Sequence, residues 1–364
     1  MRRIGFLYEK LTDERLLNQA IDEARKDKSL RKRKDIAEVV ANRETYVSKA
    51  AELLRSGLYF PAKPSVKTIR EKYSGKEREI SMIPFFPDAV IQAAIVLLLR
   101  PLILKRMDPY SCAHVVGRGQ TKVLHRIRSV LKREWRASHP KDGSRGRKNG
   151  AKYWLYVDVR HFYQNIDKRI LEGKLRRIVK DEAFIDLVMR CANVAEEGIV
   201  IGTNLSVWLS TLYLEEADRI AHENGIRYLV HFADDIVLLS GNRRKLIKTK
   251  AKLDSFLASI NLSAKPNWQC RSFEDMPLTM LQYKFHANGK VELKKPVWRN
   301  VRRALIRYPT SHRDETIASY CGMICQTDCH RAMAKYEIAK KKAIATSRIS
   351  AKAKAMDNRA KPSR

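Results

Sequence analysis

Three aspartates constrain this chain more than any other feature of its sequence. Asp158 ends an apolar segment, and Asp234 and Asp235 form an adjacent pair between two further apolar segments. Apolar strands on both sides of such a pair place it at the tip of a hairpin. If this hairpin pairs with the strand of Asp158, three carboxylates meet at one point and repel one another unless cations are present. A single Asp in a turn would be structural, but this combination favours a site for hard divalent cations.

The charge balance indicates the class of partner. The 364 residues include 73 Lys and Arg against 40 Asp and Glu, a net charge of +33. Because each phosphate contact releases counterions, nucleic acid is the expected partner; a ribosome-associated protein and a membrane-surface binder are the alternatives. Six Cys do not suggest a secreted disulfide scaffold, and the apolar runs are too short for a signal peptide or a membrane span. We therefore expect a cytoplasmic protein without membrane contacts.

The spacing of apolar residues predicts a mixture of helices and strands. The predicted helices span residues 11–57, 88–105, 167–192, 205–221 and 243–260, with more beyond 296. Hairpins are predicted over 65–83, with a turn at Ser74-Gly75, over 228–240 and over 280–293, and a strand over 153–159. Residues 132–150 are rich in Lys, Arg, Ser, Gly and Pro, which predicts a mobile basic loop. This mixture predicts the α+β class.

The segments around the aspartates resemble motifs of bacterial and phage reverse transcriptases. Residues 156–167 (YVDVRHFYQNID) resemble the first palm motif of that family, and residues 232–235 (FADD) resemble its Tyr-x-Asp-Asp motif with Phe in place of Tyr. Residues 201–206 (IGTNLS) resemble its Gln-Gly-x-x-x-Ser motif, and residues 261–269 resemble the motif that follows. The resemblance runs from about Tyr59 to Ala339. It implies a right-hand polymerase with an antiparallel palm sheet flanked by helices.

The same resemblance implies a division into subdomains. An N-terminal extension and the fingers would occupy residues 1–110. The palm would occupy 111–285 and include the basic loop at about 132–150. The thumb would occupy 286–345, and residues 346–364 would form a disordered basic tail.

The implied reaction is RNA-directed DNA synthesis by two-metal catalysis. Asp158, Asp234 and Asp235 would be the catalytic carboxylates, and the backbone carbonyl of Val159 would complete the metal site. Two Mg²⁺ ions, for which Mn²⁺ is a substitute, would lie about 3.5–4 Å apart, activate a 3′-hydroxyl and hold the leaving pyrophosphate.

Three residues are implied to line the nucleotide and the nascent base pair. Tyr163 stands where the family has an aromatic gate that clashes with a 2′-hydroxyl and so favours deoxynucleotides; plain core packing is its alternative. Gly202 would let the backbone approach the substrate closely, although a helix-start glycine is equally expected. Ile201 replaces a Gln that can hydrogen-bond in the minor groove.

Three cationic residues are candidates for contact with the triphosphate. Lys76 and Arg78 flank the hairpin of the fingers, and Arg could bind phosphate bidentately. Lys265 stands where the family has a lysine near the triphosphate, and it could act as a general acid for pyrophosphate. For all three the alternative is an ordinary solvated surface charge.

Reverse transcriptases of diversity-generating retroelements carry an aliphatic residue at the position of Ile201, so the chain most resembles this branch of the family. Enzymes of that branch miscopy template adenines, and residues 317–338 also look like the thumb of that branch. The implied partners are template RNA and its cDNA, deoxynucleoside triphosphates, and an oligomer of a small basic accessory protein.

Several positions depart from this pattern. Val207 follows Ser206 where the branch has Gln, and residues 280–283 (MLQY) lack the glycine of the primer-grip motif Phe-Leu-Gly-Tyr. Phe85-Phe86-Pro87 stands in a stretch where an Arg is expected. The alternative is therefore a phage-defence or abortive-infection reverse transcriptase with untemplated or protein-primed synthesis. An alternative of another class is a non-catalytic RNA-binding protein that retains the fold.

Overall fold

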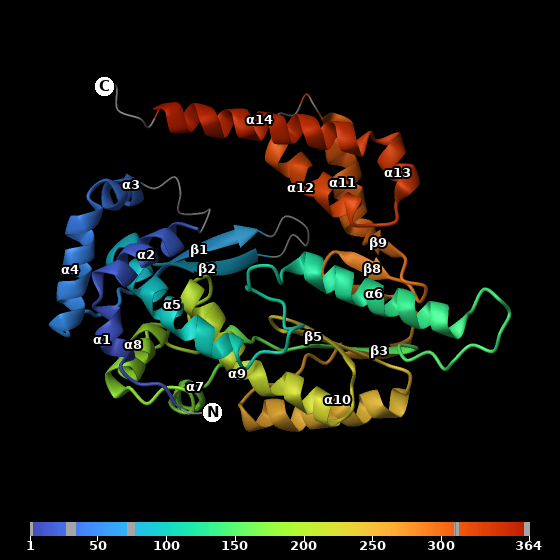
Figure 1. Cartoon of the computed structure of the whole chain (residues 1–364), viewed down its shortest axis with the longest axis horizontal. Helices are drawn as coiled ribbons and strands as arrows, with labels where there is room; N and C mark the ends of the chain where they lie inside the picture. The colour runs from blue at the N-terminus through green and yellow to red at the C-terminus, as the bar shows by residue number, and fades with distance from the viewer. Residues whose placement is uncertain (1–2, 27–33, 71–76, 309, 311–312, 360–364) are drawn as a thin grey trace. The chain divides into compact units, whose positions relative to one another are not determined.

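The computed structural model describes residues 3–26, 34–70, 77–308, 310 and 313–359. These residues form two compact units. Unit 1 comprises residues 1–114, 156–237 and 247–268, and unit 2 comprises 115–155, 238–246 and 269–364. Helices alternate with small antiparallel sheets, so the predicted α+β class is confirmed (Figure 1).

Unit 1 begins with four helices over the predicted helical region: α1 (Leu7–Leu11), α2 (Glu14–Arg25), α3 (Lys34–Ala41) and α4 (Arg43–Arg55). The carboxylate of Asp13 caps α2 by accepting a hydrogen bond from the amide of Arg15 at 2.8 Å. Leu17 and Ile21 are completely buried on the apolar face of α2, which packs on α5.

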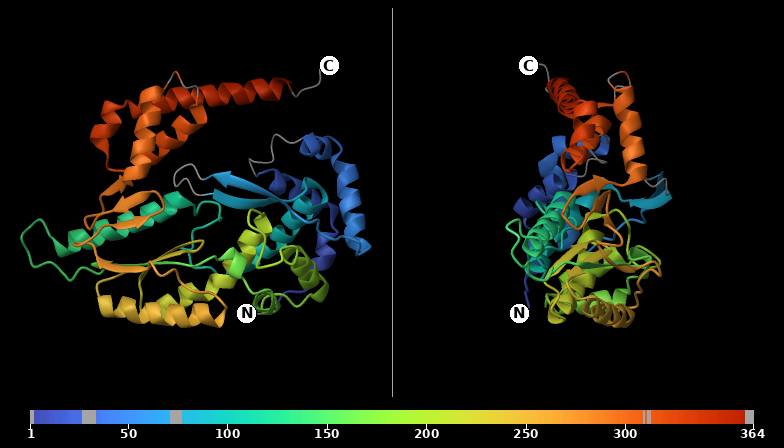
Figure 2. Two further views of the ribbon diagram at one scale, coloured as in Figure 1. Left: turned by 180° about the vertical axis from the view of Figure 1, so that it is seen from behind. Right: turned by 90° about the vertical axis from the view of Figure 1, so that its right-hand side faces the viewer.

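The predicted first hairpin is present as a two-stranded antiparallel sheet of β1 (Ser65–Arg70) and β2 (Glu77–Met82), in which Val66 is paired with Ser81. Its predicted turn at Ser74-Gly75 lies outside the described residues. Figure 2 shows this ribbon from behind.

A π-helical turn, η1 (Phe85–Ala89), leads into α5 (Val90–Leu104). By length and composition the stretch Phe85–Leu104 could cross a membrane, and it is longer than the apolar run expected from the sequence. More than half of it is buried, and α5 packs against α2 and α9, as a core helix does.

The elements that carry the aspartates follow. They are β3 (Tyr153–Asp158), the 3₁₀ turn η2 (Tyr163–Asn165), α7 (Lys168–Arg176), α8 (Glu182–Ala192), α9 (Asn204–Glu223), β4 (Tyr228–Phe232), β5 (Asp235–Ser240) and α10 (Arg243–Ser259). One helix predicted over 167–192 is thus two. The strand order β4-β5-β3-β6, with β6 at Gln269–Ser272, makes β5 and β3 neighbours.

Unit 2 contains α6 (Gln120–Ser138) and the segment after it. The predicted loop at 132–150 is wrong for its first part, because α6 continues to Ser138. Its second part is anchored: the buried carboxylate of Glu134 accepts from the guanidinium of Arg147 and from the amide of Gly150, both at 3.0 Å. A buried carboxylate needs such partners, and here they hold the segment to the helix.

The remainder of unit 2 is a three-stranded antiparallel sheet followed by helices. The strands are β7 (Leu278–Met280), β8 (Tyr283–Phe285) and β9 (Val291–Leu293), and the helices are α11 (Lys295–Arg307), α12 (Asp314–Cys325), α13 (His330–Lys335) and α14 (Ile338–Arg359). The expectation of a disordered tail over 346–364 is wrong as far as Arg359, because α14 continues to that residue. The buried carboxylate of Asp314 on α12 explains part of this order, since it accepts from Lys352 of α14 at 3.0 Å.

Candidate active site

Asp158 lies at the end of β3, and the burial of its neighbours shows which face of the strand its side chain is on. Leu155 and Val157 are completely buried, so the side chains of Tyr156 and Asp158 point to the opposite face of the strand. Beyond the strand the backbone stays paired, because the amide of Lys265 donates to the carbonyl of Asp158 at 2.8 Å. The carboxylate of Asp158 therefore projects from a backbone position that is held on both sides.

The Asp234-Asp235 pair lies in a tight turn between β4 and β5. Ala233 adopts a left-handed conformation with a φ of 57°, which is uncommon for a residue other than glycine. The amide of Val159 donates to the carbonyl of Asp234 at 3.1 Å. This backbone contact joins the turn directly to the residue after Asp158, so the predicted convergence of the two segments is present.

The carboxylate of Asp235 is mostly buried and lies in the field of the other two. Its pKa is raised to about 6: burial is the largest cause and the charges of Asp234 and Asp158 add to it, while a hydrogen bond from the Tyr156 hydroxyl at 2.5 Å and the charge of Lys265 oppose the shift. Carboxylates that perturb one another in this way share one electrostatic site.

The donor set fits a hard divalent cation, but Lys265 now neutralises part of it. The ammonium of Lys265 lies 2.6 Å from Oδ2 of Asp158, whereas Oδ1 of Asp158 is buried and has no hydrogen-bond partner. Within the described residues, no three His, Cys, Asp or Glu side chains form a group that could hold a metal ion. The oxygen donors therefore suit a hard divalent cation, and Lys265 already pairs with one of them, Oδ2 of Asp158.

Tyr163 stands close to the carboxylates, on the turn after β3. Its hydroxyl is hydrogen bonded to the Ser210 hydroxyl at 3.3 Å, and its backbone carbonyl accepts from the amide of Ile199 at 3.0 Å. Burial, above all, and the charge of Asp234 raise the pKa of the Tyr163 hydroxyl. Tyr163 is thus held at its hydroxyl and at its backbone, and its hydroxyl lies close enough to the Asp-Asp turn to be affected by the charge of Asp234.

The structure gives a packing reason for Gly202. Its φ is 108°, and a Cβ at this position would lie 2.6 Å from Cγ2 of Ile80 and 3.1 Å from the carbonyl of Ser81. The amide of Ser81 also donates to the carbonyl of Ile201 at 2.9 Å. This glycine therefore permits the close approach of strand β2 to the Ile201-Gly202 turn, and its predicted approach to the substrate stays a prediction.

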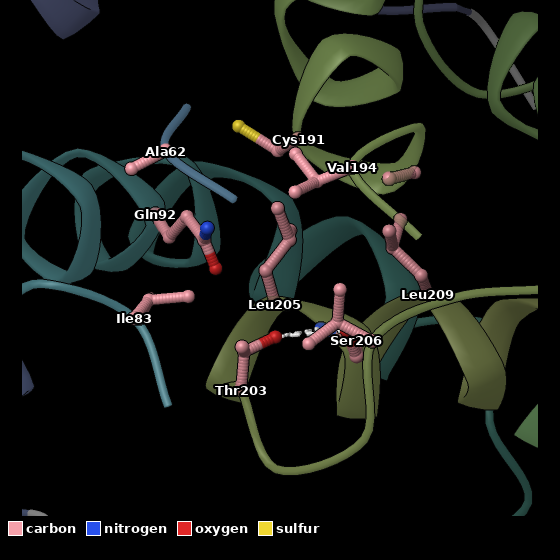
Figure 3. A pocket seen from close by; sticks show the side chains of 11 residues that line it. Ala62, Ile83, Gln92, Cys191, Val194, Thr203, Leu205, Ser206 and Leu209 are labelled. Carbon is pink, nitrogen blue, oxygen red and sulfur yellow. Dashed lines mark hydrogen bonds between the residues drawn. The ribbon is translucent and has the colours of Figure 1, made fainter. Parts of the chain in front are cut away.

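A small pocket lies beside this turn, at the start of α9 (Figure 3). Thr203 caps the helix by accepting from the amide of Ser206 at 3.2 Å, and the two hydroxyls are 2.8 Å apart. The pocket has room for little more than a water molecule, so it is a packing void and not a nucleotide site. Its lining is mostly apolar and consists of Ala62, Ile83, Gln92, Cys191, Ala192, Val194, Val200, Thr203, Leu205, Ser206 and Leu209.

Residues 69–273 match the family described as reverse transcriptase (RNA-dependent DNA polymerase). The chain belongs to the reverse transcriptase family. The match covers more than half of the chain and includes all three aspartates, and the fold is the right-hand polymerase fold of this family. No curated protein matches the sequence.

Solved structures similar to this reverse transcriptase include fungal telomerases. Telomerase from Candida albicans, in complex with a TWJ fragment of telomeric RNA, aligns at a TM-score of 0.49 and 10% identity over 82% of this chain. Apo telomerase from Candida tropicalis aligns at a TM-score of 0.48 and 11% identity over 80% of this chain. The alignments cover 58% and 59% of those chains, so this reverse transcriptase spans well under two thirds of their length.

The remaining predicted residues of the reverse transcriptase are placed less completely. Lys76 lies outside the described residues, and Arg78 is described only as a strand residue opposite Ile69. Lys265 is in the site, but it contacts Asp158 and no phosphate-binding role is visible in its contacts.

Two contributions to the site were not predicted from the sequence. Tyr156 donates its hydroxyl to Asp235, and His231 bonds to the turn and to Asp218. The sequence could have indicated Tyr156, because residues two apart on a strand share a face and Tyr156 precedes Asp158 by two. His231 had only its position before the Phe-Ala-Asp-Asp motif, and its partner on α9 is visible only in the tertiary structure.

Proposed function

We propose that this reverse transcriptase adds deoxynucleotides to a 3′-hydroxyl with RNA as the template. The observation that carries the proposal is the joining of the Asp158 strand to the Asp234-Asp235 turn through the amide of Val159, within a chain of this family. Carboxylates that lie close together repel one another, so their convergence at one point is expected to serve metal-dependent chemistry.

The residues for two divalent cations, Mg²⁺ or Mn²⁺, are proposed as follows. Asp158 and Asp234 would contact both ions, and Asp235 and the carbonyl of Val159 would complete or support the site. When bound, the ions activate the 3′-hydroxyl and stabilise the leaving pyrophosphate. Oδ1 of Asp158, which is buried without a partner, is the oxygen most clearly available.

The chain's own side chains would select and place the nucleotide. Tyr163 is anchored at its hydroxyl and at its backbone carbonyl. Its ring would lie beneath the incoming sugar and exclude a 2′-hydroxyl. Lys265, once released from Asp158, could donate a proton to pyrophosphate. Lys76 and Arg78 would contact the triphosphate from the β1–β2 hairpin.

The proposed partners are template RNA, the cDNA product and deoxynucleoside triphosphates. The net charge of +33 supports them, since binding of a polyanion relieves the self-repulsion of the chain. We also propose the fingers, palm and thumb at residues 1–110, 111–285 and 286–345, and a cytoplasmic location.

Within the family, we propose the branch of diversity-generating retroelements, with error-prone copying of template adenines and a small basic accessory protein as partner. Ile201 supports this branch because an aliphatic side chain cannot hydrogen-bond to the nascent base pair. The missing primer-grip glycine no longer argues strongly against it. Met280 pairs with Tyr283 across a two-residue turn, and Gln282, which stands at the glycine's position, does not have a positive φ, so this turn does not require a glycine there.

A defence or abortive-infection enzyme is the second candidate, supported by Val207 and by the Phe85-Phe86-Pro87 stretch. It predicts untemplated or homopolymeric product without an added primer. A non-catalytic RNA-binding protein is the third candidate, and it predicts RNA binding that is unaffected by loss of the carboxylates.

The test is primer extension on an RNA template with Mg²⁺, all four deoxynucleotides and sequencing of the product. Asp234→Asn should abolish extension, because one shared ligand of the ions loses its charge. Asp186→Asn, an exposed carboxylate on α8, is the matched control and should extend normally.

Templated product with excess errors at adenines would support the diversity-generating branch, and faithful or untemplated product would favour the defence enzyme. Equal extension by wild type and Asp234→Asn would reject the proposed catalytic site. RNA binding without any product, in the presence of bound Mn²⁺, would favour the non-catalytic reading.

A further inference from the structure

The side chain of His231 lies between two hydrogen-bond acceptors next to the Asp-Asp turn. Its Nδ1 is 2.8 Å from Oδ1 of Asp218, and its Nε2 is 2.8 Å from the carbonyl of Ala233. A neutral imidazole carries one N–H, whereas two acceptors require two. This geometry therefore indicates a charged imidazolium that donates to both groups.

The surroundings of His231 are consistent with this charge. The His231 and Asp218 side chains are only 6% and 7% exposed, so each would be costly alone and the pair is mutually compensating. Burial by itself would lower the pKa of His231, but the Asp218 carboxylate and the Ala233 carbonyl raise it above its ordinary value. The imidazolium is the form that these two partners stabilise.

The backbone around His231 is also held. Its amide donates to the carbonyl of Tyr110 at 3.1 Å, and its carbonyl accepts from the amide of Cys112 at 2.7 Å. The ring therefore extends from a backbone position that is hydrogen bonded on both sides. Asp218 lies on α9, so the pair joins this core helix to β4.

The contact with Ala233 acts on the peptide that precedes Asp234. Ala233 lies in the turn between β4 and β5, outside both strands, and a backbone carbonyl at such a position needs a donor from elsewhere. His231 supplies that donor. The direction of this carbonyl sets the plane of the Ala233–Asp234 peptide, and hence the direction in which the Asp234 side chain leaves the backbone.

We propose that His231 and Asp218 are a positioning pair for the catalytic turn: Asp218 orients and charges the imidazole, and the imidazole holds the Ala233 carbonyl so that Asp234 faces Asp158. The proposal rests on the proposed function in assigning Asp234 to metal binding. Neither residue of the pair contacts substrate in it.

The test compares two variants that separate the hydrogen bond from the charge. His231→Phe/Asp218→Leu replaces both buried partners by apolar groups, an exchange that often preserves stability, but it removes the donor to Ala233. Asp218→Asn removes the charges but allows an uncharged imidazole to donate to Ala233 and accept from the Asn amide. Lys174→Met/Glu216→Leu removes another largely buried ion pair of unit 1, one without a bond to the turn, and is the matched control.

Three readouts are needed: Mn²⁺ binding by electron paramagnetic resonance, kcat and KM for deoxynucleotide in primer extension, and the thermal unfolding midpoint with EDTA. His231→Phe/Asp218→Leu should bind Mn²⁺ at least about tenfold more weakly and lose about 100-fold in kcat with little change in KM, because a displaced ligand affects the reacting geometry. Asp218→Asn should retain most of both quantities. The control should change only the unfolding midpoint.

Wild-type Mn²⁺ affinity and kcat in a folded His231→Phe/Asp218→Leu variant would overturn the proposal. If that variant does not fold, ¹⁵N NMR of the wild-type histidines decides: a proton on Nε2 of His231 at neutral pH supports the pair, and an unprotonated Nε2, which could not donate to the Ala233 carbonyl, overturns it. Wild type that binds Mn²⁺ but makes no DNA would reject the proposed function alone, since Mn²⁺ binding would still test the pair.

Discussion

The ammonium nitrogen of Lys265 lies 2.6 Å from Oδ2 of Asp158. The amide of the same lysine donates to the carbonyl of Asp158, so backbone and side chain bind one residue. A positive charge thus already balances the carboxylate at the position where a divalent cation is proposed. An ion that binds Oδ2 must displace this lysine, which makes Lys265 a competitor of the metal at that oxygen before it can act on a triphosphate.

Lys265→Met should therefore bind Mn²⁺ more tightly than wild type. The Lys265 side chain is 39% exposed, and partly exposed ion pairs are worth up to about 1 kcal/mol, so the gain should be roughly fivefold. Electron paramagnetic resonance of free Mn²⁺ measures it. Lys252→Met, an exposed lysine on α10, should have wild-type affinity. Unchanged affinity in Lys265→Met would mean that the ion pair does not compete with the metal.

Asp235→Asn should stabilise the metal-free protein at neutral pH but not in acid. The pKa of Asp235 is raised to about 6, so the folded state holds its proton more tightly than the unfolded state. Stability from this residue therefore falls as the pH rises from about 4 to about 6. Asn carries no charge and should recover on the order of 1–3 kcal/mol at pH 8. Urea unfolding in EDTA at pH 4 and pH 8 measures the difference; a gain of the same size at both pH values would rule out this cause.

Gly202→Ala should destabilise the protein by about 1–3 kcal/mol, because the new Cβ would overlap Ile80 and the positive φ is unfavourable for alanine. Adding Ile80→Ala should restore part of the loss, since it removes the overlapping Cγ2. Gly173→Ala is the control: it lies in α7 with open space around its Cβ position, and it should be neutral or slightly stabilising. Chemical denaturation compares the three variants with wild type, and equal effects at positions 202 and 173 would contradict the close approach of β2.

Tyr163→Val should weaken discrimination against ribonucleotides by about tenfold or more, because the ring that would meet a 2′-hydroxyl is removed. Tyr163→Phe should keep the discrimination, since the bond to Ser210 anchors the ring but does not create its bulk. The ratio of kcat/KM for deoxynucleotide and ribonucleotide tests both variants. If Tyr163→Val discriminates as well as wild type, the gate lies elsewhere.

Ile201→Gln should reduce errors at template adenines by about two- to tenfold, the range expected for one added hydrogen bond. The backbone should be undisturbed, because the Ile201 carbonyl is held by the amide of Ser81 whatever the side chain is. Sequencing of cDNA from both enzymes on one template gives the error rates. An adenine error rate equal to that of wild type would separate Ile201 from infidelity.

The two incorrect expectations about basic segments have one physical origin. Both residues 132–150 and the tail beyond 346 are rich in Lys and Arg, and such composition alone predicts solvated, mobile chain. In each segment one buried carboxylate from a helix changes this outcome: Glu134 binds the first and Asp314 the second. Charge composition does not reveal which carboxylate is buried or which residues of the segment it binds.

What the sequence by itself determined is the chemistry of the site. Alternation along β3 and the apolar segments around the Asp-Asp pair are local patterns, and they suffice to place three carboxylates on a strand end and a turn. Only the tertiary structure decided which groups surround them. Lys265 reaches Asp158, Tyr156 reaches Asp235 and His231 reaches Asp218 through strand pairing and helix packing, and the partner in each contact depends on register and burial that no local pattern contains.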